Sequence, residues 1–129
     1  LKKYIHLRRQ MTQALWKGGV KLMTGSDSPE WFLVQGFAVH NEIETFVQAG
    51  LTPYAALETA TRNPAAYLGV LNRKGTVEEG KEASLILLDK NPLEDIRNTR
   101  SIRGIFSGNQ YYDRGQLDQM LQQAKASAN

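Results

Sequence analysis

The residue best placed for chemistry in this sequence is an aspartate that follows a short apolar run. Asp27 stands in a Gly-Ser-Asp-Ser-Pro stretch directly after residues 20–24. This pattern predicts a buried strand that ends near the carboxylate, where the loops of parallel sheets hold reacting groups. A carboxylate there could act as a base or nucleophile, although no local motif puts a His, Lys or Ser beside it. The same stretch is also typical of a turn in which the aspartate bonds its own backbone, and this alternative stays open.

Two histidines and two aromatic residues are the other side chains that could contact a ligand. His40 precedes a predicted helix, where a histidine is more often structural than a substrate contact, so both roles stay open. His6 lies within the first predicted helix and is interpreted as structural. Trp31 and Phe32 follow Asp27, and they would either cover a pocket or pack on the neighbouring helix.

The elements that would position these residues are a helix, a strand and further helices. Apolar residues at three- and four-residue steps predict an amphipathic helix over residues 1–17, which a pair of glycines ends. A buried strand is expected at residues 20–24. Asn41 is expected to cap the next helix, and Thr52 with Pro53 to open another that ends at the following Asn-Pro.

The second half of the chain has a β pattern. A short strand and turn are expected at residues 75–81, and a strand at 83–88 that is apolar enough to be buried on both faces. A hairpin is expected from 102–106 and 110–112, followed by a weak helix from residue 117 to the end.

These patterns divide the chain into three parts. They predict a part made of helices and one buried strand over residues 1–74, a β part over 75–115, and a terminal helix or tail over 116–129. Three or four short strands leave unpaired edges and one solvent-exposed face, so the β part is expected to need further polypeptide to pair with it or cover it.

Composition narrows the class of protein. The 129 residues suffice for one domain with a core, but a complete (β/α)8 barrel needs roughly 200 or more. With 16 Lys and Arg against 13 Asp and Glu, the net charge is +3, and no nucleic-acid motif accompanies it. We therefore expect no nucleic-acid partner. The lack of cysteine excludes disulfides and cysteine zinc sites.

The sequence contains no apolar run of membrane-spanning length and no signal-peptide pattern. We therefore expect a soluble, cytoplasmic protein without a membrane partner. The chain begins with Leu1, and the helical pattern starts at once, so its N-terminus is expected to be truncated.

A series of short motifs runs in a fixed order from about residue 20 to residue 112. They are Gly25-Ser26-Asp27, His40-Asn41-Glu42-Ile43-Glu44, Ala49-Gly50-Leu51-Thr52-Pro53, Ala60-Thr61-Arg62-Asn63-Pro64-Ala65, the stretch 75–85, and Asn91-Pro92-Leu93. Together they resemble the carboxyl-terminal third of the metal-dependent amidohydrolase superfamily. The resemblance is closest to its imidazolonepropionase-like and Xaa-Pro dipeptidase (prolidase) branch.

The resemblance implies an α/β fold, the C-terminal fragment of a (β/α)8 TIM barrel with residues 20–24 as its eighth strand, plus part of a small β-sandwich. It implies that Asp27 binds or adjoins a divalent metal, usually zinc. Asp27 would act as the general base for the water that attacks a small amide or dipeptide substrate. His40 and Trp31 are then the candidates for substrate contact.

The departures from the family pattern matter as well. Ser26 stands where the family usually has Thr, and Ser84 where it usually has Asp. The histidine and lysine ligands of the other barrel strands have no counterpart here, because His6 and His40 are the only histidines and lack ligand spacing. The fragment alone is therefore expected to be inactive.

Two interpretations follow. The first is the C-terminal segment of a metal-dependent amidohydrolase that cleaves C–N bonds, with Xaa-Pro dipeptides as one candidate substrate. The alternative is a short non-catalytic binding or assembly module that pairs its exposed strand edges with another chain or a second copy of itself.

Overall fold

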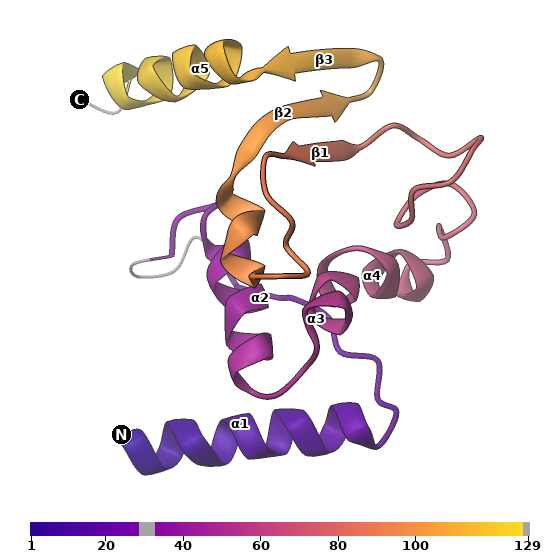
Figure 1. Cartoon of the computed structure of the whole chain (residues 1–129), viewed down its shortest axis with the longest axis vertical. Helices are drawn as coiled ribbons and strands as arrows, with labels where there is room; N and C mark the ends of the chain where they lie inside the picture. Colours follow the sequence, from indigo (N-terminus) through magenta and orange to yellow (C-terminus); the bar gives the residue numbers. More distant parts are fainter. Residues whose placement is uncertain (29–32, 128–129) are drawn as a thin grey trace.

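The computed structural model describes residues 1–28 and 33–127 of the chain. Its elements, in chain order, are α1 (Lys2–Lys17), α2 (Ala38–Gln48), α3 (Pro53–Ala60), α4 (Arg62–Tyr67), β1 (Leu85–Leu88), the 3-10 helix η1 (Ile96–Arg100), β2 (Ile102–Ser107), β3 (Gln110–Asp113) and α5 (Arg114–Ser127). The sheet and α5 lie at one end of the molecule, α1 lies at the other, and α2 lies between them (Figure 1). The predicted mixed α/β class is confirmed in this form.

The start of α3 agrees with the sequence prediction. Oγ1 of Thr52 accepts a hydrogen bond of 3.2 Å from the backbone N–H of Ala55, and Pro53 occupies the first turn. The proline costs nothing there because the first N–H groups of a helix have no partner within the helix.

The start of α2 differs from the prediction. The helix begins at Ala38, so Asn41 lies inside it and does not cap it. The chain enters the helix through a turn in which the carbonyl of Val34 accepts from the N–H groups of both Phe37 and Ala38. This turn supplies the first bonds, and the expected side-chain cap is not used. His40 is accordingly a residue of the helix itself.

The break between α3 and α4 also differs from the prediction. It falls at Thr61, ahead of the Asn-Pro pair that was expected to cause it. Pro64 lies in the first turn of α4, where its missing N–H is tolerated. The proline therefore follows a helix start and does not end a helix.

The sheet has three antiparallel strands in the order β1-β2-β3. The predicted hairpin is confirmed, with Ile105 opposite Tyr112, and β1 pairs with β2 through Ile86 opposite Ile105. Residues 75–81 form turns and loop and not the expected strand. The expected two-sided burial of β1 is also wrong for this chain, because Ile86 is 57% exposed and Leu87 is 45% exposed.

The core is small and joins the helices to η1. Its buried residues are Ile43 of α2, Leu51, Ala56 of α3 and Ile96 of η1. Ala56 is fully buried, and its small side chain lets α3 approach α2 closely. This cluster fixes α2 in place, which matters for the site described below.

Helix α1 forms over the predicted residues, but its apolar stripe is not covered by the described chain. Tyr4, Leu7, Met11 and Leu15 are each about half exposed or more. Trp16, at the end of the helix, packs against the core.

Residues 20–24, predicted to be a buried strand, are not a paired strand in the structure. Exposed and half-buried residues nevertheless alternate without interruption from residue 21 to residue 28. This is the two-residue period of a strand with one covered face. The predicted burial is wrong for this chain, because Val20 is 46% and Met23 is 38% exposed. No neighbouring strand among the described residues supplies the hydrogen bonds of a ladder.

Candidate functional site

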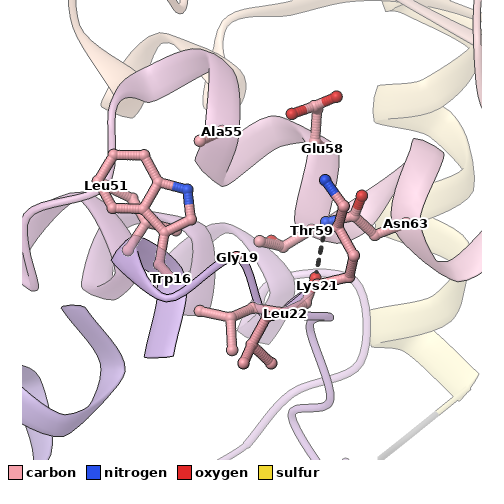
Figure 2. A pocket seen from close by; sticks show the side chains of 10 residues that line it. Trp16, Gly19, Lys21, Leu22, Leu51, Ala55, Glu58, Thr59 and Asn63 are labelled. Atoms are coloured by element: carbon pink, nitrogen blue, oxygen red, sulfur yellow. Dashed lines mark hydrogen bonds between the residues drawn. The ribbon is translucent and has the colours of Figure 1, made fainter. Parts of the chain in front are cut away.

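The segment that leads to Asp27 is held against the helices by hydrogen bonds. The backbone N–H of Thr24 donates to the carbonyl of Thr59 at 2.9 Å. The side-chain amide of Asn63 donates to the carbonyl of Leu22, also at 2.9 Å, as the dashed line in Figure 2 shows. The inward side chain of Leu22 packs on the core. These contacts fix one face of the segment to α3 and α4 and leave the other face open.

Asp27 lies on the open face, and its side chain is exposed. Its φ angle of 53° is in the left-handed region, which few residues other than glycine adopt and which aspartate tolerates better than most. Just after it, the hydroxyl of Ser28 donates to the carbonyl of Leu33 at 3.0 Å. The loop therefore turns sharply at the carboxylate and presents it outward.

Glu42 of α2 contacts the same loop, which the sequence interpretation did not anticipate. Its Oε1 accepts a hydrogen bond of 2.8 Å from the backbone N–H of Gly25. Its Oε2 is buried and has no hydrogen-bond partner in the described part of the chain. A signal was available, because Glu42 falls one helical turn after the buried Ala38 and beside the buried Ile43. A carboxylate on an inward face needs a partner.

His40 faces the second half of the chain. Its Nδ1 lies 3.0 Å from Oγ1 of Thr99, a buried residue of η1 whose hydroxyl donates to the carbonyl of Ile96. Because that hydroxyl has one hydrogen, Nδ1 must be the donor toward Thr99, and Nε2 carries the free lone pair of the neutral ring. Burial, helped by the positive charge of Arg100, lowers the pKa of His40 below its usual value. The ring is therefore neutral at pH 7.

The structure does not gather the predicted site residues into one cluster. Asp27 and His40 share no contact among the hydrogen bonds and ion pairs of the described residues. His6 is exposed on α1. Trp31 lies outside the described residues. Asp27 and His40 are connected indirectly, because Glu42, two residues after His40 on α2, holds the loop of Asp27.

The described residues do not by themselves fit a metal ion. Residues 1–28 and 33–127 contain no group of three or more His, Asp or Glu side chains placed to hold one. One exposed carboxylate supplies a single ligand, whereas a catalytic zinc site uses three from the protein.

Two pockets lie near the extended segment, and neither includes Asp27. One, of about 70 Å³, lies between the end of α1 and α3, with Trp16 on one side and Asn63 on the other (Figure 2). The second, of about 220 Å³, is lined by Lys21 and Met23 together with residues of α4. Asp27 lines neither of these two pockets, and it lies on the open face of the segment.

Comparison with known proteins decides the family. Residues 4–110 match the profile of the Amidohydrolase family, which is most of the chain. The chain belongs to the amidohydrolase family. The family assignment made from the motifs is therefore confirmed, and imidazolonepropionases and prolidases are among the proteins that the chain resembles.

Amidohydrolase relatives include the imidazolonepropionase of Thermoplasma acidophilum, 40% identical over 63 residues. That match covers 46% of this chain and 15% of the relative. Among solved structures, a putative prolidase from Bifidobacterium longum superposes with a TM-score of 0.73 at 29% identity, covering 88% of this chain and 30% of that one. A Xaa-Pro dipeptidase superposes with a TM-score of 0.71 at 26% identity, covering 81% and 25%.

The chain thus spans less than a third of the amidohydrolases it matches, about 15% of the imidazolonepropionase and 30% of the prolidase.

Within residues 1–28 and 33–127, none of the helices is both long enough and apolar enough to cross a membrane.

Proposed function

We propose that this chain forms the carboxyl-terminal part of a hydrolase that cleaves C–N bonds in small amide or dipeptide substrates, with Xaa-Pro dipeptides as the first candidates. The observation that carries the proposal is the exposed carboxylate of Asp27, turned outward at the end of an anchored extended segment in an amidohydrolase chain. The likeness to a Xaa-Pro dipeptidase and a putative prolidase supports the choice of substrate.

The uncovered surfaces of the chain support the view that further polypeptide completes the fold. Residues 21–28 alternate in burial like a strand but lack a neighbouring strand among the described residues, which suits the eighth strand of a barrel whose other strands lie elsewhere. The apolar stripe of α1 and the outer face of β1 are exposed as well. The three-stranded sheet would then be one portion of a β-sandwich.

The role that we assign to Asp27 is that of proton acceptor. As water attacks the carbonyl carbon of the substrate, its proton passes to the Asp27 carboxylate, and the C–O bond forms. The same proton then passes to the leaving nitrogen as the C–N bond breaks. Asp27 would also be one ligand of a divalent metal, with zinc the first candidate. The remaining ligands are not among the described residues, so no step is assigned to the metal here.

Substrate contact is proposed for His40 and Trp31. His40 uses Nδ1 for Thr99, so Nε2 is the atom that remains for a substrate. As an acceptor in the neutral ring, Nε2 suits an N–H or ammonium group of a dipeptide.

The experiment compares two proteins on Xaa-Pro dipeptides and simple N-acyl amino acids, with and without added zinc. One is this chain, and the other is a polypeptide that carries this sequence within a complete barrel. We expect hydrolysis by the complete protein and no turnover by this chain. Turnover by the chain alone would contradict the view that it is one part of a larger enzyme. A complete protein that cleaves none of these bonds would overturn the proposed hydrolase activity.

A second candidate function, a non-catalytic assembly module, is favoured by the exposed Ile86 and Leu87 on the outer strand β1. In that case two copies would pair their β1 edges. Sedimentation of this chain distinguishes the two, because a monodisperse monomer at working concentration removes the reason for strand pairing between copies.

A further inference from the structure

We propose that Glu42 is a positioning residue that sets the place of Asp27, an inference that rests on the proposed function. Glu42 Oε1 accepts from the N–H of Gly25 at 2.8 Å, two residues before Asp27. The hydrogen bond joins a side chain of α2 directly to the loop that carries the proposed proton acceptor.

The first step of the argument is that packing does not hold Gly25. A side chain at this position would meet no atom within 4 Å, so no neighbouring group presses on the backbone there. Gly25 also follows the two residues whose backbone is bonded to the helices, Leu22 through its carbonyl and Thr24 through its N–H. In the described part of the chain, the bond to Glu42 is therefore the anchor nearest to Asp27 on its N-terminal side.

The second step is that α2 can act as a rigid support. Ile43, next to Glu42, is 5% exposed and belongs to the core, and Ala38, one turn earlier, is 4% exposed. A bond from an N–H to a carboxylate is also stronger than one between neutral groups. Glu42 thus ties the loop to one of the best-fixed parts of the chain.

The third step concerns the carboxylate of Glu42 itself. Its Oε2 is buried without a hydrogen-bond partner in the described residues. Burying a charge without a full set of partners is costly, and such a group persists where it serves another purpose. Holding the left-handed turn at Asp27, with its φ of 53°, is a purpose that this geometry offers.

The proposal distinguishes two substitutions of Glu42. Glu42→Gln keeps an oxygen that can accept from Gly25 and replaces the buried, unpartnered oxygen with an uncharged amide. Glu42→Ala removes the acceptor. Glu44→Ala is the matched control, because Glu44 lies on the same helix and pairs with Arg100 rather than with the loop.

The first measurement is hydrogen exchange of the Gly25 amide in this chain by NMR. We expect slow exchange in the parent and in Glu42→Gln, and exchange about tenfold faster or more in Glu42→Ala. The Thr24 amide, which is bonded to Thr59, is the internal reference and should not change. An unchanged Gly25 amide in Glu42→Ala would overturn the proposal.

The second measurement is steady-state kinetics in a polypeptide that carries this sequence within a complete barrel. Glu42→Ala should lower kcat by about 10- to 100-fold with KM nearly unchanged, because a misplaced base slows the chemical step more than it weakens binding. Glu42→Gln should recover most of kcat, and Glu44→Ala should stay within about twofold of the parent.

The outcomes separate this proposal from the proposed function. Faster Gly25 exchange with an unchanged kcat would overturn the positioning role and leave the hydrolase intact. Equal loss of kcat in Glu42→Gln and Glu42→Ala would also overturn it, because the acceptor oxygen would then be irrelevant. A parent protein that hydrolyses no amide would overturn the proposed function first, and the positioning role with it.

Discussion

Nδ1 of His40 lies 3.0 Å from Oγ1 of Thr99, and this contact joins the helical half of the chain to η1, which leads into the sheet. Arg100, next to Thr99, reinforces the junction by pairing with Glu44 at 3.1 Å. Glu42, on the same helix, holds the loop of Asp27. Helix α2 therefore carries contacts both to η1 and to the loop of the candidate site.

The first prediction concerns the pH dependence of stability. The pKa of His40 is lowered in the folded chain, so the unfolded chain binds this proton more readily. The stability that the neutral ring contributes is complete above the unfolded pKa of about 6.5, and it is lost as the pH falls from there through the lowered pKa of the folded ring. The drop in melting temperature from pH 7.5 to pH 5.5 should therefore be larger in the parent than in His40→Asn, whose side chain does not titrate.

His40→Asn is a suitable comparison because its amide nitrogen can take the place of Nδ1 as donor to Thr99. Other groups that titrate in the same range act equally on both proteins. Equal losses of melting temperature in parent and variant would show that His40 does not govern the acid sensitivity of this junction.

The second prediction tests the small core. Leu51 is 3% exposed and contacts the cluster that joins α2, α3 and η1. Leu51→Ala should lower the free energy of unfolding by about 3 kcal/mol, because it removes buried methyl groups and leaves a cavity. Leu93→Ala, at a residue 50% exposed, should cost less than about 1 kcal/mol. Denaturant unfolding of both variants gives the comparison. Equal losses in the free energy of unfolding would contradict the assignment of Leu51 to the core.

The third prediction concerns the β2–β3 hairpin. A side chain at Gly104 would lie 2.6 Å from Cε2 and 2.7 Å from Cζ of Tyr111, whose ring is packed 4.7 Å from that of Phe106. Gly104→Ala should therefore displace the ring and cost about 1–3 kcal/mol in stability. In a Tyr111→Ala background, Gly104→Ala should change the free energy of unfolding very little, and a double-mutant cycle measures the difference. Costs that simply add would contradict the contact.

Local sequence signals predicted the elements that depend on neighbouring residues. The Thr52 cap, the apolar stripe of α1 and the β2–β3 hairpin all formed as expected, because each is set by nearby side chains or turn residues. The start of α2 was misjudged because Asn41 looked like a cap, whereas the turn before Ala38 supplies the first hydrogen bonds.

Structural features that depend on residues distant in the sequence could not be predicted from local patterns. Residues 20–24 have the pattern of a strand, but a strand needs a neighbour, and a pattern cannot say whether the neighbour is present. The short helix η1 was missed too, although Asp95 caps it by accepting from the N–H of Arg97. An aspartate three residues after Pro92 is equally typical of a loop.

The candidate site was predicted only in part for the same reason. The motif singled out Asp27, and the role of this residue stays a prediction. The contacts of Glu42 with Gly25 and of His40 with Thr99 span 17 and 59 residues, so no local pattern encodes them. The inward position of Glu42 on α2 was the one available clue.

The central claim is that the Asp27 carboxylate accepts the proton of the attacking water, and Asp27→Asn tests it most directly. The control is Asp118→Asn, at a surface residue of α5 that pairs with Arg114 one turn away. In a polypeptide that carries this sequence within a complete barrel, we measure kcat for amide or Xaa-Pro hydrolysis. The account predicts that Asp27→Asn lowers kcat by about 10²- to 10⁴-fold while Asp118→Asn leaves it unchanged. Near-normal turnover in Asp27→Asn would contradict it.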